Sequence, residues 1–141
     1  MPQSALFAAR GTAAEIEAGE TFAPKFDEHG LIGAVVTEAD TGEVLMFAFM
    51  NSEALALSIS TRQATFYSRS RKKLWRKGEE SGNTLQIVDM WTDCDQDVIW
   101  VRATIQGDGK ACHTGRRSCF YRSIPLGEPP TPGLKLTFRS L

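Results

Sequence analysis

The 141-residue sequence lacks the features that mark membrane, secreted or general nucleic-acid-binding proteins. No apolar run approaches the roughly 20 residues that a membrane-spanning helix requires. The first residues contain no basic segment followed by a long apolar stretch, which argues against a secretory signal. The formal net charge is only -1 at pH 7, so the chain as a whole is not a polycation. We therefore expect a cytoplasmic protein, whose thiols stay reduced and available to metal.

Cysteine is scarce, yet its arrangement is the strongest chemical signal in the chain. Three thiols cannot all pair in intramolecular disulfides, whereas three protein ligands and one open position are typical of a catalytic zinc site. The spacing C-x17-C-x6-C lacks the paired C-x2-C elements of zinc ribbons and fingers. Small buried thiols are the alternative, although the second cysteine lies among polar residues. The predicted zinc ligands are Cys94, Cys112 and Cys119.

Three aspartates alternate around the first of these cysteines. On an extended backbone Asp93, Asp95 and Asp97 would project to one face, and Cys94 to the other. Three carboxylates on one face favour a hard cation, and we expect Mg²⁺. An EF-hand is excluded because its sixth position would be Val98 instead of glycine. The alternative is that the aspartates cap a turn between two strands.

Basic residues are concentrated in one stretch. Six of the sixteen Lys and Arg residues lie within the nine positions from Arg69 to Lys77. A solvated loop would explain this concentration, as would a site for an anionic group such as a substrate phosphate. The predicted substrate contacts are Ser68, Arg69, Ser70, Arg71, Lys77, Gly78, Ser81 and Gly82.

The two histidines differ in their surroundings. His113 follows Cys112 directly, so it is a candidate general base or a fourth metal ligand. His29 lies in a polar turn and is expected at the surface. Within the basic stretch, Trp75 is expected to pack in the core rather than to stack on a base.

Apolar patterning predicts a mainly β (α+β) fold with one or two helices and no internal repeat. N-cap residue types at Asn51 and Ser52, followed by apolar residues at helical spacing, predict a helix over 52–61. Residues 84–94 carry apolar side chains on both faces, so this strand is expected to be largely buried. The expected strands are 31–36 and 44–49, which form a hairpin, then 64–68, 84–94 and 98–105.

The same patterning divides the chain into three parts. Residues 1–25 are predicted to form an N-terminal arm or helix, and residues 26–124 the folded domain. Residues 125–141 form a proline-rich C-terminal tail that is expected to be extended or disordered.

Five ordered segments resemble the phosphoribosyl-AMP cyclohydrolase family, which opens the adenine ring of phosphoribosyl-AMP in the third step of histidine biosynthesis. The resemblance spans roughly residues 31–121, and five motifs in one order make it more specific than any single motif. The segments are residues 50–55, 67–71, 74–83, 93–97 and 111–120.

This resemblance implies a β pseudo-barrel, an intertwined homodimer and a cyclohydrolase domain at 26–124. One zinc per subunit would take Cys94 from one subunit and Cys112 and Cys119 from its partner, with Mg²⁺ at the three aspartates. Zinc-activated water would attack C6 of the N1-ribosylated ring, and the N1–C6 bond would open with His113 as base. No nucleic-acid or membrane partner is expected.

Two other functions compete with this one. A nonenzymatic zinc module could bind an anionic partner such as RNA through the basic stretch, although the neighbouring aspartates oppose it. A zinc deaminase of free bases or nucleosides lacks its H-x-E and P-C-x-x-C signatures in this sequence.

Overall fold

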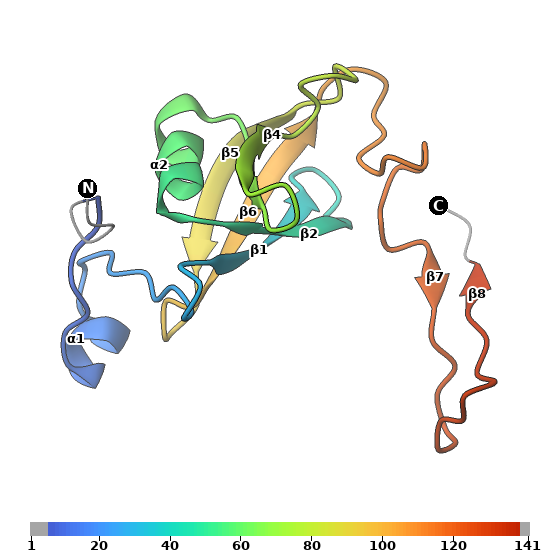
Figure 1. Cartoon of the computed structure of the whole chain (residues 1–141), viewed down its shortest axis with the longest axis horizontal. Coiled ribbons are helices and arrows are strands. Elements are labelled where there is room, and N and C mark those ends of the chain that lie inside the picture. Colours follow the sequence, from blue (N-terminus) through green and yellow to red (C-terminus); the bar gives the residue numbers. More distant parts are fainter. Residues whose placement is uncertain (1–5, 139–141) are drawn as a thin grey trace.

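The computed structural model describes residues 6–138 and shows a central α+β domain with an extended segment at each end (Figure 1). Both helices are short, and strands dominate the domain. The elements in chain order are α1 (Ala13–Ala18), β1 (Ile32–Glu38), β2 (Val44–Met50), α2 (Ser52–Thr61), β3 (Thr65–Ser68), β4 (Lys73–Arg76), β5 (Leu85–Thr92), β6 (Val98–Ile105), β7 (Arg122–Ser123) and β8 (Thr137–Phe138).

A four-stranded sheet in the order β2-β1-β6-β5 forms the centre of the domain. Strands β1 and β6 are parallel, and the other neighbours are antiparallel. Because side chains alternate across a sheet, Ala34, Val36 and Val101 point to one face and are fully buried there. Helix α2 and the β3–β4 hairpin supply Leu55 and Phe66 to the same hydrophobic core. We call the opposite face of the sheet the outer face.

Local chemistry explains where α2 begins and how it is attached. The Asn51 side chain accepts a hydrogen bond from the Ala54 amide at 2.8 Å, which caps the first turn. Arg62 ends the helix in the left-handed region with φ 61°. The buried Ser58 hydroxyl donates to the Thr65 carbonyl and accepts from the Thr65 amide. The helix is thereby joined to β3.

The mainly β prediction is confirmed, as are the hairpin at β1–β2 and the helix over 52–61. The described strands do not close into the expected barrel, because β2 and β5 remain the two edges of the central sheet. The burial predicted for residues 84–94 is wrong in part. A bulge between Ile87 and Asp89 shifts the register, and Val88 and Trp91 are exposed on the far side of the strand.

At the two ends of the chain, the structure agrees with the predictions only in part. Among the described residues of the expected N-terminal helix, only Ala13–Ala18 is helical, with a capping box between Thr12 and Glu15. The proline-rich segment bends at residues 127–128 and turns at residues 132–133 between the two-residue strands β7 and β8. Residues 139–141 of the predicted tail lie outside the described residues. Among residues 6–138, no helix is long and apolar enough to cross a membrane.

Candidate functional site

The loop after β6 brings Cys112 and Cys119 together. Paired backbone hydrogen bonds between 111–112 and 116–117 fold the loop back on itself, and Gly115 occupies a turn position with φ 85°. The Ser118 hydroxyl then donates to the Val44 carbonyl, and the Cys119 amide donates to the Leu45 carbonyl at 2.7 Å. The loop is therefore attached to the first residues of β2, and it brings the two thiols close enough for each to affect the pKa of the other.

The two thiols differ in acidity because their partners differ. Burial disfavours ionisation of Cys112, but hydrogen bonds from the hydroxyl and amide of Thr114 and from the Cys119 thiol lower its pKa. The Thr114 hydroxyl lies 3.0 Å from the Cys112 sulfur. Burial, reinforced by the charge of Cys112, raises the pKa of Cys119 to about 11. The pair is thus suited to share one proton, which a soft cation such as zinc can displace.

Cys94 lies in the β5–β6 turn, at the opposite end of the sheet from this pair (Figure 1). The Cys119 amide bonds to Leu45, level with Val101 on β6, whereas Cys94 lies beyond the paired Thr92 and Ile99. Along the strands, about four residues separate Cys94 from the level of Leu45. Across the sheet, about two strand spacings separate them, which gives a distance on the order of 15–20 Å. Sulfur ligands of one zinc must each lie about 2.3 Å from the metal. One chain in this fold therefore cannot supply all three.

The three aspartates lie in a tight turn between β5 and β6, so the expectation of an extended backbone is wrong, whereas Mg²⁺ binding stays a prediction. The Gln96 amide donates to the Asp93 carbonyl at 3.1 Å, and Gln96 has φ 56°. The Cys94 sulfur donates to an Asp95 carboxylate oxygen at 2.8 Å. Ligand atoms of Asp93, Cys94 and Asp95 all lie within 4.8 Å of one another. The thiol and the carboxylates therefore share one side of the turn.

Electrostatics in this turn disfavour further negative charge. The hydrogen bond to Asp95, and the charges of Asp95 and Asp93, raise the pKa of Cys94. A hydrogen bond to Asp93 is the main cause of the raised pKa of Asp97. Burial disfavours the charged form of Asp93, but hydrogen bonds from Asp97 lower its pKa on balance. A cation bound among these exposed side chains would reverse these effects on Cys94 and Asp97.

Sequence reasoning missed the role of Gln96. Its side chain is buried, accepts from the Ala23 amide at 2.8 Å and donates to the Ile16 carbonyl at 3.0 Å. These bonds attach the N-terminal segment to the aspartate turn. Their partners lie more than seventy residues away in sequence, and a glutamine between aspartates gives no local signal for such contacts.

A cationic cleft of about 440 Å³ contains most of the other predicted residues. It lies where the β3–β4 hairpin and its following loop face the thiol loop. His113 and Cys112 line one side of it. From the predicted substrate contacts, the cleft contains Arg71, Lys77, Gly78 and Ser81, and it also contains Arg76, Lys110, Glu79, Glu80 and Asp108.

Three of the four remaining predicted contacts lie in a second, aromatic hollow of about 660 Å³. The structure separates them from the cleft because the chain reverses at Lys72, where φ is 53°. Ser68, Arg69 and Ser70 line this hollow with Phe47, Ala48, Phe49, Tyr67 and Trp75.

Several contacts shape the two hollows. The guanidinium of Arg69 lies 4.3 Å above the Phe49 ring. Trp75 packs on the core residue Phe66 with ring centroids 5.0 Å apart, as predicted, and it also borders both hollows. Gly82 lines neither hollow; its amide closes a turn on the Gly78 carbonyl at 2.8 Å. His29 is exposed, as expected.

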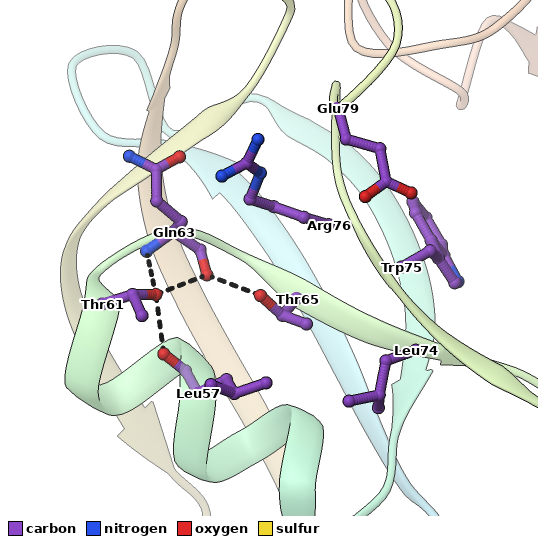
Figure 2. A pocket seen from close by; sticks show the side chains of 8 residues that line it. All are labelled: Leu57, Thr61, Gln63, Thr65, Leu74, Trp75, Arg76 and Glu79. Atoms are coloured by element: carbon purple, nitrogen blue, oxygen red, sulfur yellow. Dashed lines mark hydrogen bonds between the residues drawn. The ribbon is translucent and has the colours of Figure 1, made fainter.

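A third hollow lies between α2 and the β3–β4 hairpin and contains none of the predicted site residues (Figure 2). Thr61 and Gln63 on one side are tied to the helix end, where the Thr61 hydroxyl donates to the Leu57 carbonyl at 2.7 Å. Leu74 and Trp75 form the other side. Neither a thiol nor a histidine is among the residues that line it.

Together the fold and the site define a small α+β domain in which a cleft lined by four Lys and Arg side chains lies beside the loop that carries Cys112 and Cys119. A family model described as phosphoribosyl-AMP cyclohydrolase matches residues 46–121. The chain belongs to the phosphoribosyl-AMP cyclohydrolase family.

Curated relatives agree with this assignment. A protein named phosphoribosyl-AMP cyclohydrolase from Sinorhizobium fredii is 60% identical over 111 residues, covering 79% of this chain and 73% of the relative. Proteins of the same name from Rhizobium rhizogenes and Brucella anthropi are 56% and 58% identical, covering 82% and 77% of this chain and 78% and 77% of the relatives. Membership of an enzyme family disfavours the nonenzymatic RNA-binding alternative.

Proposed function

We propose that this chain hydrolyses phosphoribosyl-AMP in histidine biosynthesis, with an active site that two copies of the chain complete. The observation that carries the proposal is the position of His113 and Cys112 on one side of a cleft whose other side bears Arg71 and Lys77. A metal-ligand pair, a proton acceptor and cations for phosphate thus meet in one place. We expect the enzyme in the cytoplasm, where its thiols stay reduced.

The donor set fits zinc only when a second chain is present. Cys112 and Cys119 already lie in one loop, where each affects the pKa of the other. Cys94 lies too far away in the same chain, so we assign the third position to Cys94 of a second copy in a homodimer. When bound, zinc would supply a water that ionises near neutral pH. The neighbouring Asp93, Asp95 and Asp97 would hold Mg²⁺, which favours carboxylate oxygens.

His113 is the proposed general base. It is exposed on the wall of the cleft, beside Cys112, so a water bound there lies within its reach. Its imidazole would accept a proton from the attacking water as the oxygen bonds to C6. As the N1–C6 bond breaks, the same imidazole would return the proton to N1, and the oxygen on C6 would release its remaining proton to solvent as it becomes a carbonyl, which leaves the base ready for another cycle.

Two separate cationic places suit a substrate that carries a phosphate at each end. In the cleft, Arg71 and Lys77 provide charge, and the Gly78 amide and Ser81 hydroxyl provide donors. In the aromatic hollow, Arg69 is held over Phe49 beside the hydroxyls of Ser68 and Ser70. We assign one phosphate to each place, with the purine between them.

The test follows the loss of phosphoribosyl-AMP by the purified chain before and after thorough zinc removal. We expect activity to disappear with zinc and to return when zinc is restored. The His113→Ala variant should keep about one zinc per chain but lose about 10²–10⁴-fold in kcat, whereas His29→Ala, at the exposed surface, should behave like the unmodified enzyme. Turnover that is indifferent to zinc removal, or normal turnover in His113→Ala, would refute the mechanism.

A further inference from the structure

Gln96 differs from its neighbours in the turn between β5 and β6. Of residues 93–97, all of which the structure describes, only Gln96 is buried, with 5% of its surface exposed. The exposed residues of the turn are Asp93, Cys94, Asp95 and Asp97. An amide side chain is costly to bury without hydrogen bonds. The partners of Gln96 therefore indicate what the side chain does.

These partners are backbone groups of the N-terminal segment. The Gln96 Oε1 accepts a hydrogen bond from the Ala23 amide at 2.8 Å. Its Nε2 donates to the Ile16 carbonyl at 3.0 Å and to the Thr21 carbonyl at 3.4 Å. The backbone carbonyl of Gln96 accepts a further bond from the Lys25 amide at 2.7 Å. Both ends of the side-chain amide are thus satisfied by a segment far away in sequence.

The backbone at Gln96 is also unusual. Its φ of 56° lies in the left-handed region, which costs free energy for a residue with a Cβ and which glycine adopts freely. The Gln96 amide donates to the Asp93 carbonyl at 3.1 Å, and the Asp97 amide donates to the Asp93 carboxylate at 3.0 Å. A conformation that suits glycine but carries a glutamine indicates a role for the side chain.

The anchor segment, residues 16–25, is itself held in place. The Arg10 guanidinium donates to the Ala23 carbonyl at 2.7 Å, and Ile16 is buried with 8% of its surface exposed. Figure 1 shows the N-terminal part of the chain reaching the domain beside the turn between β5 and β6. The anchor segment lies outside residues 46–121, which the family model matches. It is therefore an element of this chain that the family match does not cover.

We propose that Gln96 is a positioning residue through which the anchor segment holds the turn ready to bind metal. The inference rests on the proposed function, which assigns Cys94 to zinc and the three aspartates to Mg²⁺, and it adds the element that arranges them. Carboxylates this close repel one another before a cation binds, so a released turn would separate them. In the structure the ligand atoms of Asp93, Cys94 and Asp95 lie within 4.8 Å of one another.

Metal affinity should depend on how often the turn adopts this conformation. When only a fraction of the chains has the binding conformation, the apparent dissociation constant rises by the inverse of that fraction. A turn released to a population of about 1–10% would bind metal about 10–100-fold more weakly. Removal of a residue that orients a metal ligand typically has an effect of this size.

The first test compares the zinc affinity of Gln96→Gly with that of the unmodified full chain, by competition with a chromogenic chelator. Glycine favours the observed φ but has no side chain to bond to the anchor segment. A positioning role predicts a zinc dissociation constant about 10–100-fold higher. If Gln96 served only the shape of the turn, glycine would bind zinc equally or more tightly. A rise of less than about threefold would therefore overturn the proposal.

Ser58→Ala controls for a general loss of stability, because it removes a buried hydroxyl between α2 and β3. This variant should keep its zinc dissociation constant within about threefold. Equal losses of zinc affinity in Ser58→Ala and Gln96→Gly would overturn the positioning role. Saturating zinc should restore kcat in Gln96→Gly, since all the ligands remain. A kcat that stays low with the site full would overturn a role through the metal.

The second test separates the anchor segment from the turn without changing the turn. Ile16→Asp places a charge at a buried position of α1 and should raise the zinc dissociation constant about tenfold or more. In a Gln96→Gly background the same change should add less than about threefold, because the connection is already lost. Glu17→Gln, at the next and exposed position, is the matched control. Equal effects of Ile16→Asp in the two backgrounds would overturn the proposal.

A metal-free measurement distinguishes this inference from the proposed function. With metal removed, amide hydrogen exchange at positions 93–97, corrected for intrinsic rates, should be at least about tenfold faster in Gln96→Gly. Unchanged exchange would overturn the positioning role whether or not the chain binds zinc. Zinc affinities that follow the predicted pattern in a chain that does not turn over phosphoribosyl-AMP would count against the proposed function alone.

Discussion

Because Cys94 lies far from Cys112 and Cys119 within one chain, the activity of dimers that mix two cysteine variants can be predicted quantitatively. We consider two chains, one with Cys94→Ala and the other with Cys112→Ala. Each alone should be inactive, because every site in its homodimer lacks one thiol. Cys94 lies on the order of 15–20 Å from the thiol pair, so no rearrangement of side chains lets one chain replace the missing ligand from within itself.

The mixed dimer should regain one site. Its intact site combines Cys112 and Cys119 of the first chain with Cys94 of the second, whereas the other site lacks two thiols. Random pairing gives about half mixed dimers, each with one working site of two, so the mixture should show about a quarter of the unmodified specific activity. Mixed dimers isolated with two different tags should show about half.

The assay measures turnover of phosphoribosyl-AMP and zinc per dimer in the co-expressed chains. A matched control mixes Cys112→Ala with Cys119→Ala. Both substitutions damage the same loop, so neither site of that mixed dimer is intact and no activity should return. If the first mixture also fails to recover while the mixed dimers are demonstrably formed, the reasoning from the sheet geometry is refuted.

The remaining predictions concern pH and stability. Raised pKa values keep Cys94 and Cys119 protonated between pH 6 and 8, so zinc must displace at least two protons, and its apparent affinity should rise about a hundredfold or more per pH unit. Competition titration with a chromogenic chelator measures this, and a slope near zero would contradict it. Ser58→Ala removes the buried hydroxyl that bonds the Thr65 carbonyl and amide and should lower the free energy of unfolding by about 1–3 kcal/mol. In urea titrations Ser60→Ala, an exposed position on the same helix, should change it by less than about 0.5 kcal/mol.

Features encoded by neighbouring residues were predictable from the sequence. The limits of α2 follow from the Asn51 cap and from apolar spacing, both of which lie within one helix. The contact between Cys112 and Cys119 is also local, because one folded loop joins them. The type of chemistry could be predicted for the same reason: the thiols, the histidine and the cations are recognisable before their positions are known.

Features that depend on distant contacts or on an unexpected backbone conformation could not be predicted. Gln96 and Lys72 are not glycine, yet both have positive φ and reverse the chain. The reversal at Gln96 places Cys94 beside the carboxylate of Asp95. The reversal at Lys72 divides the basic stretch between two hollows. The exposure of Trp91 depends on whether another element covers the outer face, which no pattern within one strand reveals.

The same geometry connects metal binding, assembly and catalysis. Thiols at opposite ends of one sheet would form a zinc site only when two chains meet, so the free energy of zinc binding would stabilise the proposed dimer. The cluster of Arg116, Tyr121 and Phe138 attaches the C-terminal segment, residues 122–138, to the loop that carries Cys112 and Cys119. This contact would restrain that loop at the position where His113 lines the cleft. A contact outside the cleft would thereby support the arrangement of the residues proposed to act on the substrate.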